Sequence, residues 1–230
     1  MPNKDIFVKQ DSLTQNLEEL IKNENKRRNF ARNNEVYTPV QITECPRRII
    51  YRSRGTKVEE NSSFQQEIIR DNAKLKWISI LASLSGIKIK EKDLVVADCN
   101  YNLTGTVDAV LQIEDAKYIL LVKTLSQEEY TKVNKDGAIK KHIIELMMLM
   151  WLIEIKDGIL LYENKNTQDV NIFHILPYKA IITSAKNKCL KLLGNQLKGT
   201  IPIRPYDSKD NRECMVCEYQ SICWEQKRDE

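Results

Sequence analysis

The sequence is notable first for what is scarce. Only two histidines and seven glycines occur among 230 residues, and six cysteines are too few for a disulfide scaffold in a chain of this length. The longest apolar run, residues 146–153, is far shorter than the roughly 20 residues that a membrane-spanning helix needs. No phosphate-binding loop, dinucleotide-binding glycine motif or nucleophile elbow is present. These absences argue against a secreted disulfide protein, a membrane protein and a nucleotide-dependent enzyme, and we expect an intracellular protein.

Secondary-structure signals predict a mixed α/β fold. Valine- and isoleucine-rich segments predict two strands before residue 100, a hairpin over 106–125 and a second hairpin over 157–176. Helices are expected over 138–156, between the hairpins, and over 178–193, ending at Gly194. Upstream, capping boxes at Ser12 and Ser62 predict two further helices, the second reaching about Ser85. Thr38 is expected to cap a helix that Pro46 breaks and Gly55 ends.

Charge is concentrated near the N-terminus. Residues 20–57 contain ten basic residues and three acidic ones. Four arginines follow Pro46, and helical spacing places Arg48 and Arg52 on one face and Arg47 and Arg54 on another. A basic edge of this kind suits the phosphates of DNA. Docking of a partner protein and intramolecular ion pairing are the alternatives.

The cysteines cluster at the opposite end of the chain. Cys214, Cys217 and Cys223 follow a C-x2-C-x5-C spacing, one ligand short of a closed four-thiolate site. Cys99 and Cys189 lie in apolar settings, whereas Cys45 lies in the basic sequence ECPRRIIYR, and we expect Cys45 to be the fourth ligand. Spacing alone leaves zinc and an iron–sulfur cluster both open.

The combination of CPRRIIYR near the N-terminus with the cysteine trio at the C-terminus resembles the RecB-like PD-(D/E)XK nucleases. The closest branch is that of the CRISPR-associated RecB-like exonuclease and the nuclease domain of AddB. The resemblance covers most of residues 37–226 and implies one restriction-endonuclease-like domain with a mixed sheet flanked by helices. Residues 1–36 would form a basic helical extension. The resemblance also implies a 4Fe-4S cluster held by Cys45, Cys214, Cys217 and Cys223. This cluster would join the two ends of the domain.

The catalytic motifs of the family are only partly matched. Asp108, in Gly105-Thr-Val-Asp108, corresponds to the family's metal-binding aspartate, and Lys123 corresponds to the lysine that orients water. Leu121, however, occupies the position of the second metal-binding carboxylate. The family's helical histidine is also missing, with Lys74 or Lys76 as the expected equivalents, and Glu145 and Leu149 replace the glutamine and the tyrosine of a later helix.

Two functions follow from this mixed pattern. The altered motif positions favour a pseudonuclease, a DNA-binding subunit of a DNA-processing complex that acts on single strands or ends. The alternative is an active Mg²⁺- or Mn²⁺-dependent exonuclease or endonuclease, in which Glu145 supplies the missing acid beside Asp108 and Lys123.

Overall fold

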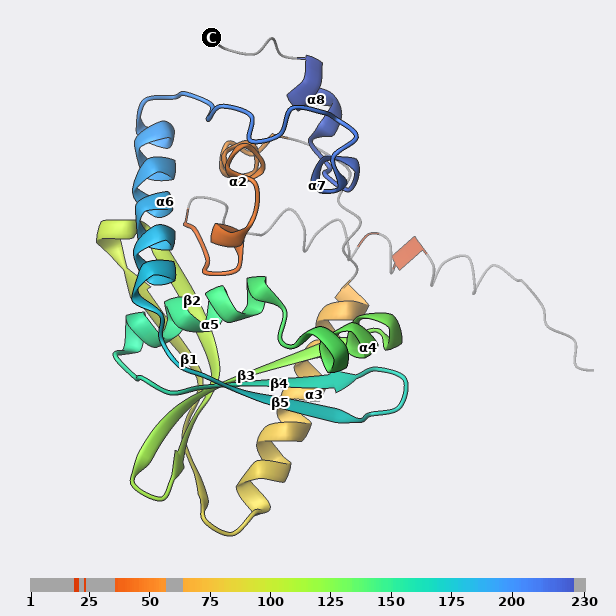
Figure 1. The fold of residues 1–230 in the computed structure, drawn as a ribbon, viewed down its shortest axis with the longest axis vertical. Helices are drawn as coiled ribbons and strands as arrows, with labels where there is room; N and C mark the ends of the chain where they lie inside the picture. Colours follow the sequence, from red (N-terminus) through yellow and green to blue (C-terminus); the bar gives the residue numbers. More distant parts are fainter. Residues whose placement is uncertain (1–18, 21–22, 24–35, 57–63, 226–230) are drawn as a thin grey trace, which may run out of the picture.

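The computed structural model describes residues 19–20, 23, 36–56 and 64–225. Apart from residues 19–20, 23 and 36, the predicted helix from Ser12 and the predicted N-terminal extension lie outside these residues, as does Ser62 of the second capping box. A five-stranded sheet forms the centre of the molecule (Figure 1). Its strands are β1 (Ile87–Asp98), β2 (Leu103–Ile113), β3 (Ala116–Leu125), β4 (Gly158–Asn164) and β5 (Val170–Ile175).

The strands lie in the sheet in their sequence order, β1-β2-β3-β4-β5. Neighbouring strands are antiparallel except β3 and β4, which are parallel. A parallel pair needs a crossover connection, and the chain supplies it with two helices, α4 (Gln127–Asp136) and α5 (Lys140–Ile153). The expected mixed-sheet α/β fold is therefore confirmed.

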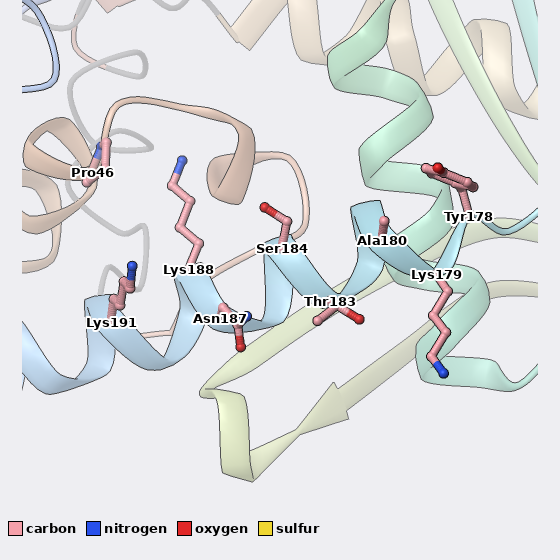
Figure 2. Close-up of a pocket in the computed structure, with 9 residues that line it drawn as sticks. All are labelled: Pro46, Tyr178, Lys179, Ala180, Thr183, Ser184, Asn187, Lys188 and Lys191. Carbon is pink, nitrogen blue, oxygen red and sulfur yellow. The ribbon is translucent and has the colours of Figure 1, made fainter.

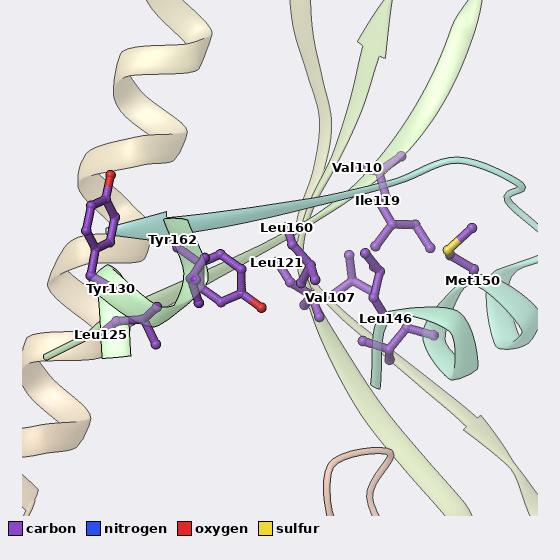
Figure 3. Close-up of a cluster of buried hydrophobic side chains, with 12 residues drawn as sticks. Val107, Val110, Ile119, Leu121, Leu125, Tyr130, Leu146, Met150, Leu160 and Tyr162 are labelled. Atoms are coloured by element: carbon purple, nitrogen blue, oxygen red, sulfur yellow. The ribbon is translucent and has the colours of Figure 1, made fainter. Parts of the chain in front are cut away.

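Helices cover both faces of the sheet. Helix α3 (Phe64–Ser83) packs Ile78 against a cluster that includes Leu120 and Leu161. Helix α5 packs Leu146 and Met150 against the opposite face (Figure 3). The apolar run over residues 146–153 is thus the core of the domain, as its all-round hydrophobicity predicts.

A further layer lies on the outer side of α5. It comprises α6 (Lys179–Leu197), the short 3-10 helix η1 (Gln41–Thr43) and α2 (Pro46–Ser53), with a second 3-10 helix, η2 (Cys99–Tyr101), before β2. The C-terminal helices α7 (Arg212–Met215) and α8 (Gln220–Glu225) lie beside α2, although more than 150 residues separate them in the sequence (Figure 1). Among the described residues, no helix is long and apolar enough to cross a membrane.

The structure corrects several expected boundaries. The two strands expected before residue 100 are one strand, β1, with a register shift between Ile89 and Glu91. Helix α4 was not expected, and α6 continues through Gly194 to Leu197. The helix expected from Thr38 is divided at Pro46, as predicted: Thr38 Oγ1 accepts the Gln41 N–H at 3.4 Å, and Pro46 begins α2.

Candidate functional sites

Asp108 lies where two strands of the sheet separate. The pairing of β2 with β3 ends at Ala109 and Leu120, so the backbone N–H of Val122 has no backbone partner on β2. Asp108 Oδ2 accepts this N–H at 2.7 Å. Burial raises the pKa of the Asp108 carboxyl, whereas the Val122 N–H and the nearby ammonium of Lys123 act to lower it. The carboxylate is thus fixed by the backbone of the strand that carries the lysine.

Glu145 reaches the same place from helix α5. Its Oε1 accepts a hydrogen bond from Lys123 Nζ at 2.8 Å, and the residue is only 9% exposed. Its second oxygen, Oε2, is buried and has no hydrogen-bond partner among the described residues. A buried carboxylate oxygen without a donor is costly, and a bound cation would satisfy it.

These three side chains line one pocket of about 410 Å³, which we call the carboxylate pocket. Its walls come from the loop before η1, from α3, from the facing parts of β2 and β3, and from α5. Leu121, at the position of the expected carboxylate, is 2% exposed and forms part of the apolar wall with Leu149. Asp108, Lys123 and Glu145, which the sequence analysis singled out, therefore lie in one pocket, while their roles stay a prediction.

Helix α3 contributes three further charged side chains to this pocket. Arg70, Asp71 and Lys74 line it, and Lys74 Nζ lies 2.5 Å from Asp93 Oδ1. Lys76, the other expected equivalent of the family histidine, pairs with Glu163 at 2.7 Å and does not line the pocket. The sequence reasoning missed Arg70 and Asp71, although their i−4 and i−3 spacing from Lys74 places all three on one face of the helix.

Gly105 explains why the strand approaches α5 so closely. A Cβ atom at this position would lie 2.6 Å from Leu149 Cδ2 and 3.1 Å from Pro39 Cγ. Only glycine allows the loop before η1 and helix α5 to pack together over β2 at this point. The glycine of the Gly-x-x-Asp sequence therefore shapes the wall of the pocket that Asp108 enters.

The four expected cluster ligands line a second cavity, here called the thiol cavity. Cys45 at the start of α2 faces the same small space, of about 20 Å³, as Cys214, Cys217 and Cys223. Burial raises the pKa of the Cys214 and Cys217 thiols, and negative charge on Cys45 would raise both further. Four thiols are the donor set of a zinc site or an iron–sulfur cluster. In the described part of the chain, however, no three Cys, His, Asp or Glu side chains converge closely enough to hold a single metal ion.

Aromatic and charged groups surround the thiol cavity. The Tyr51 and Tyr219 rings stack with centroids 5.4 Å apart, and the Arg204 guanidinium lies 4.2 Å from the centre of the Trp224 ring. Arg204 also donates to the carbonyl oxygen of Cys223 at 2.7 Å. The tyrosine stack joins the C-terminal segment to α2, whereas Arg204 joins it to the chain that follows α6.

The four arginines predicted to contact DNA are engaged within the chain. Glu218 accepts from Arg48 at 2.7 Å and from Arg52 at 3.2 Å, and Arg52 also pairs with Glu44 at 3.0 Å. Arg47 is buried and donates to Pro202 O, and Arg54 donates to Thr200 O. Helix α2 therefore does not present the open arginine edge that the sequence suggested. The described contacts match the intramolecular alternative: Glu44 directly precedes α2 in the sequence, whereas Glu218 and the carbonyls of Thr200 and Pro202 come from the C-terminal part of the chain.

Comparison with known proteins identifies the fold of the chain. No model of a known protein family matches the sequence, and no curated protein is significantly similar to it. Solved structures do match. The alkaline exonuclease LHK-Exo from Laribacter hongkongensis superposes with a TM-score of 0.57 at 12% identity, covering 75% of this chain and 93% of that one. The chain thus shares the overall fold of this exonuclease.

Two further solved structures also match the fold of the chain. The protein designated SSO0001 matches with a TM-score of 0.58 at 20% identity, over 90% of this chain and 95% of its own. LHK-Exo in complex with dAMP matches with a TM-score of 0.56 at 13% identity, over 74% and 91% of the two chains. The expected mixed α/β fold is thus one that the chain shares with an exonuclease, whereas membership of the PD-(D/E)XK nucleases and of their RecB-like branch stays a prediction.

Proposed function

We propose that this protein is a metal-dependent DNA nuclease whose second acid comes from helix α5. The observation that carries the proposal is the presence of Glu145 in the same pocket as Asp108, 2.8 Å from Lys123. This arrangement is the one that the active alternative requires. DNA as the substrate is supported by the fold that the chain shares with an alkaline exonuclease.

The pocket has a donor set suited to a hard divalent cation. Asp108 and Glu145 would hold Mg²⁺ or Mn²⁺ through carboxylate oxygens, and the unpartnered Oε2 of Glu145 is the atom most in need of a cation. When bound, the ion would polarise the scissile phosphate and increase the acidity of the attacking water. Lys123 would orient that water, while Arg70 and Lys74 would attract the phosphate.

The test is degradation of end-labelled single-stranded and duplex DNA with Mg²⁺ or Mn²⁺. We expect Glu145→Gln and Asp108→Asn each to reduce cleavage by at least about a hundredfold, because each removes one of two charged ligands. Glu128→Gln, which neutralises an exposed carboxylate on α4, is the matched control. Cleavage that survives both pocket substitutions would refute the proposed site.

A pseudonuclease remains the second candidate because β3 contributes Leu121 in place of a carboxylate, and because Lys123 already neutralises Glu145. In that case the chain would act as a DNA-binding subunit of a larger DNA-processing complex. It would retain DNA on a filter in the presence of Mn²⁺ without shortening it. Cleavage by the native chain that Asp108→Asn abolishes would exclude this second function.

We also propose that the thiol cavity holds a 4Fe-4S cluster through Cys45, Cys214, Cys217 and Cys223. The support is the convergence of both ends of the domain on one cavity lined by all four thiols. Anaerobic purification should give a brown protein with four iron and four sulfide per chain. A colourless protein that carries one zinc ion per chain would instead establish the alternative.

A further inference from the structure

A long part of the chain contains no carboxylate. No aspartate or glutamate occurs between residues 170 and 206, whereas five lysines and one arginine do. Helix α6 lies wholly within this stretch and carries four of the lysines. In a chain with 32 acidic residues, such a gap concentrates uncompensated positive charge on one element.

Helical spacing brings the polar residues of α6 to one face. Lys179, Thr183, Asn187 and Lys191 follow one another at intervals of four, and Ser184 and Lys188 lie in the adjacent row. These residues line an open groove of about 980 Å³, which reaches from Tyr178 to Pro46 (Figure 2). No carboxylate lines this groove, and Lys179 and Lys191 are both exposed. At about 1.5 Å per residue, the two lysines lie about 18 Å apart along the helix.

The ends of the groove differ in chemistry. At one end Tyr178 is 61% exposed, so its ring is available for stacking. Near the other end, Lys188 Nζ donates to the carbonyl oxygen of Glu44 at 2.5 Å, which fixes one ammonium group in the wall. The fourth lysine of α6, Lys186, does not line the groove. Its Nζ atom lies 4.3 Å from the centre of the Trp151 ring and 4.9 Å from the centre of the Tyr101 ring.

We propose that the α6 groove binds a single strand of DNA, with phosphates on Lys179, Lys188 and Lys191 and a base stacked on Tyr178. Cationic side chains interspersed with hydroxyl and amide donors, next to an exposed aromatic ring, are the elements that single-strand binding uses. This surface lies outside the carboxylate pocket and replaces the arginines of α2 as the place where the chain meets DNA. The proposal shares its substrate class with the proposed function but requires no hydrolysis.

The test measures binding of a fluorescent thymidine oligonucleotide by anisotropy in EDTA, where no metal-dependent cleavage occurs. The double variant Lys179→Glu/Lys191→Glu should lose at least tenfold in affinity, and its dependence on salt should become less steep. Its control is Lys88→Glu/Lys117→Glu, which makes the same charge change at exposed positions on the far end of the sheet. Tyr178→Ala should weaken binding at least about fivefold, and Tyr178→Phe should not.

Any of the following results would overturn the proposal. Equal losses in the α6 variant and its control would show that only overall charge matters. An unchanged affinity of Tyr178→Ala, tighter binding of duplex than of single strands, or no binding by the native chain would also contradict it. By contrast, a chain that binds the oligonucleotide through α6 but cleaves nothing with Mg²⁺ or Mn²⁺ would refute the proposed nuclease activity while upholding this surface.

Discussion

At the scale of single residues, the carboxylate pocket shows a conflict between stability and chemistry at Asp108. Burial raises the pKa of this carboxyl above its ordinary value, so the folded state binds the proton more tightly than the unfolded state does. The Asp108 carboxyl therefore contributes to the free energy of unfolding at low pH, and this contribution is lost as pH rises through the raised pKa.

Asp108→Asn should consequently stabilise the metal-free protein at pH 7 while abolishing cleavage. Asparagine Oδ1 can still accept the N–H of Val122, so the hydrogen bond is retained without the cost of a buried charge. Urea unfolding in EDTA measures this effect. A lower free energy of unfolding than that of the native chain would contradict the assignment of Asp108 as a destabilising, functional group.

His142 gives a second prediction, with the opposite dependence on pH. This residue lies one turn before Glu145, and its Nδ1 is 3.1 Å from the hydroxyl of Tyr162. Burial lowers the pKa of His142 to about 3. Its contribution to stability is complete above the unfolded value of about 6.5 and is lost as pH falls towards 3. From pH 7 to pH 5 the loss should be about 2 kcal/mol.

His142→Gln keeps an acceptor for the Tyr162 hydroxyl but does not titrate. Its free energy of unfolding should therefore change less between pH 7 and pH 5 than that of the native chain. Equal pH dependence of the two proteins, measured by urea unfolding, would show that His142 is not held neutral in the folded state.

Single residues also show what the sequence can and cannot supply. Glu145 could be named in advance because its position on the helix after β3 faces the strand that bears Lys123. Asp71 and Arg70 were missed because the family pattern directs attention to the histidine position alone, although helical spacing from Lys74 could have pointed to them. The pairing of the α2 arginines within the chain could not be foreseen for a different reason: a local charge excess says nothing about Glu218, 166 residues beyond Arg52.

At the scale of elements, helices α4 and α6 show which local signals are reliable. Helix α4 was missed although Ser126 and Glu129 form a complete capping box in front of it. The same signal had predicted helices elsewhere in the chain. Helix α4 is short and strongly polar, and only Tyr130 and Val133 are buried. Its apolar periodicity is therefore weak, and the sequence resembles that of a loop.

Gly194 was expected to end α6, but the helix continues because a glycine stops a helix only when it adopts the left-handed conformation. Gly194 does not have a positive φ angle, and a Cβ atom placed there would meet nothing within 4 Å. Gly194→Ala should therefore stabilise the protein by up to about 1 kcal/mol, because alanine loses less backbone entropy in a helix.

Gly105→Ala is the matched contrast to this substitution. The added methyl group would collide with Leu149 at 2.6 Å, and we expect a loss of about 1–3 kcal/mol. Thermal unfolding of both variants tests the pair. A destabilised Gly194→Ala protein would contradict the continuous helix.

At the scale of the whole molecule, the two chain ends meet through more than the cysteines. Glu218 contacts both Arg48 and Arg52, and its pKa is lowered by these guanidinium groups despite the opposing effect of burial. The lowered pKa means that this contribution to stability is present at neutral pH and is lost as pH falls through the folded value. Glu218→Ala should cost about 1–2 kcal/mol, measured at pH 7 by urea unfolding.

These protein contacts predict how the molecule responds to loss of the proposed cluster. Cys45→Ser should abolish the brown colour of the proposed cluster, yet the C-terminal segment should stay docked on α2 through Glu218 and Tyr219. Limited proteolysis and circular dichroism measure whether the C-terminal segment stays docked and folded. Cys99→Ser, at an exposed thiol outside the thiol cavity, is the control. Release of the segment in Cys45→Ser alone would show that the cluster is the principal link.

The order of the strands has a consequence for synthesis on the ribosome. Each strand pairs with its sequence neighbour, and Asp108, Lys123 and Glu145 lie within one short stretch of the chain. The carboxylate pocket can thus assemble while the last residues are still being translated. Cys45 emerges early, and as a ligand of the proposed cluster it would have to wait for Cys214, Cys217 and Cys223. Delivery of iron and sulfide to that proposed cluster would therefore be a late event in maturation, after the carboxylate pocket is complete.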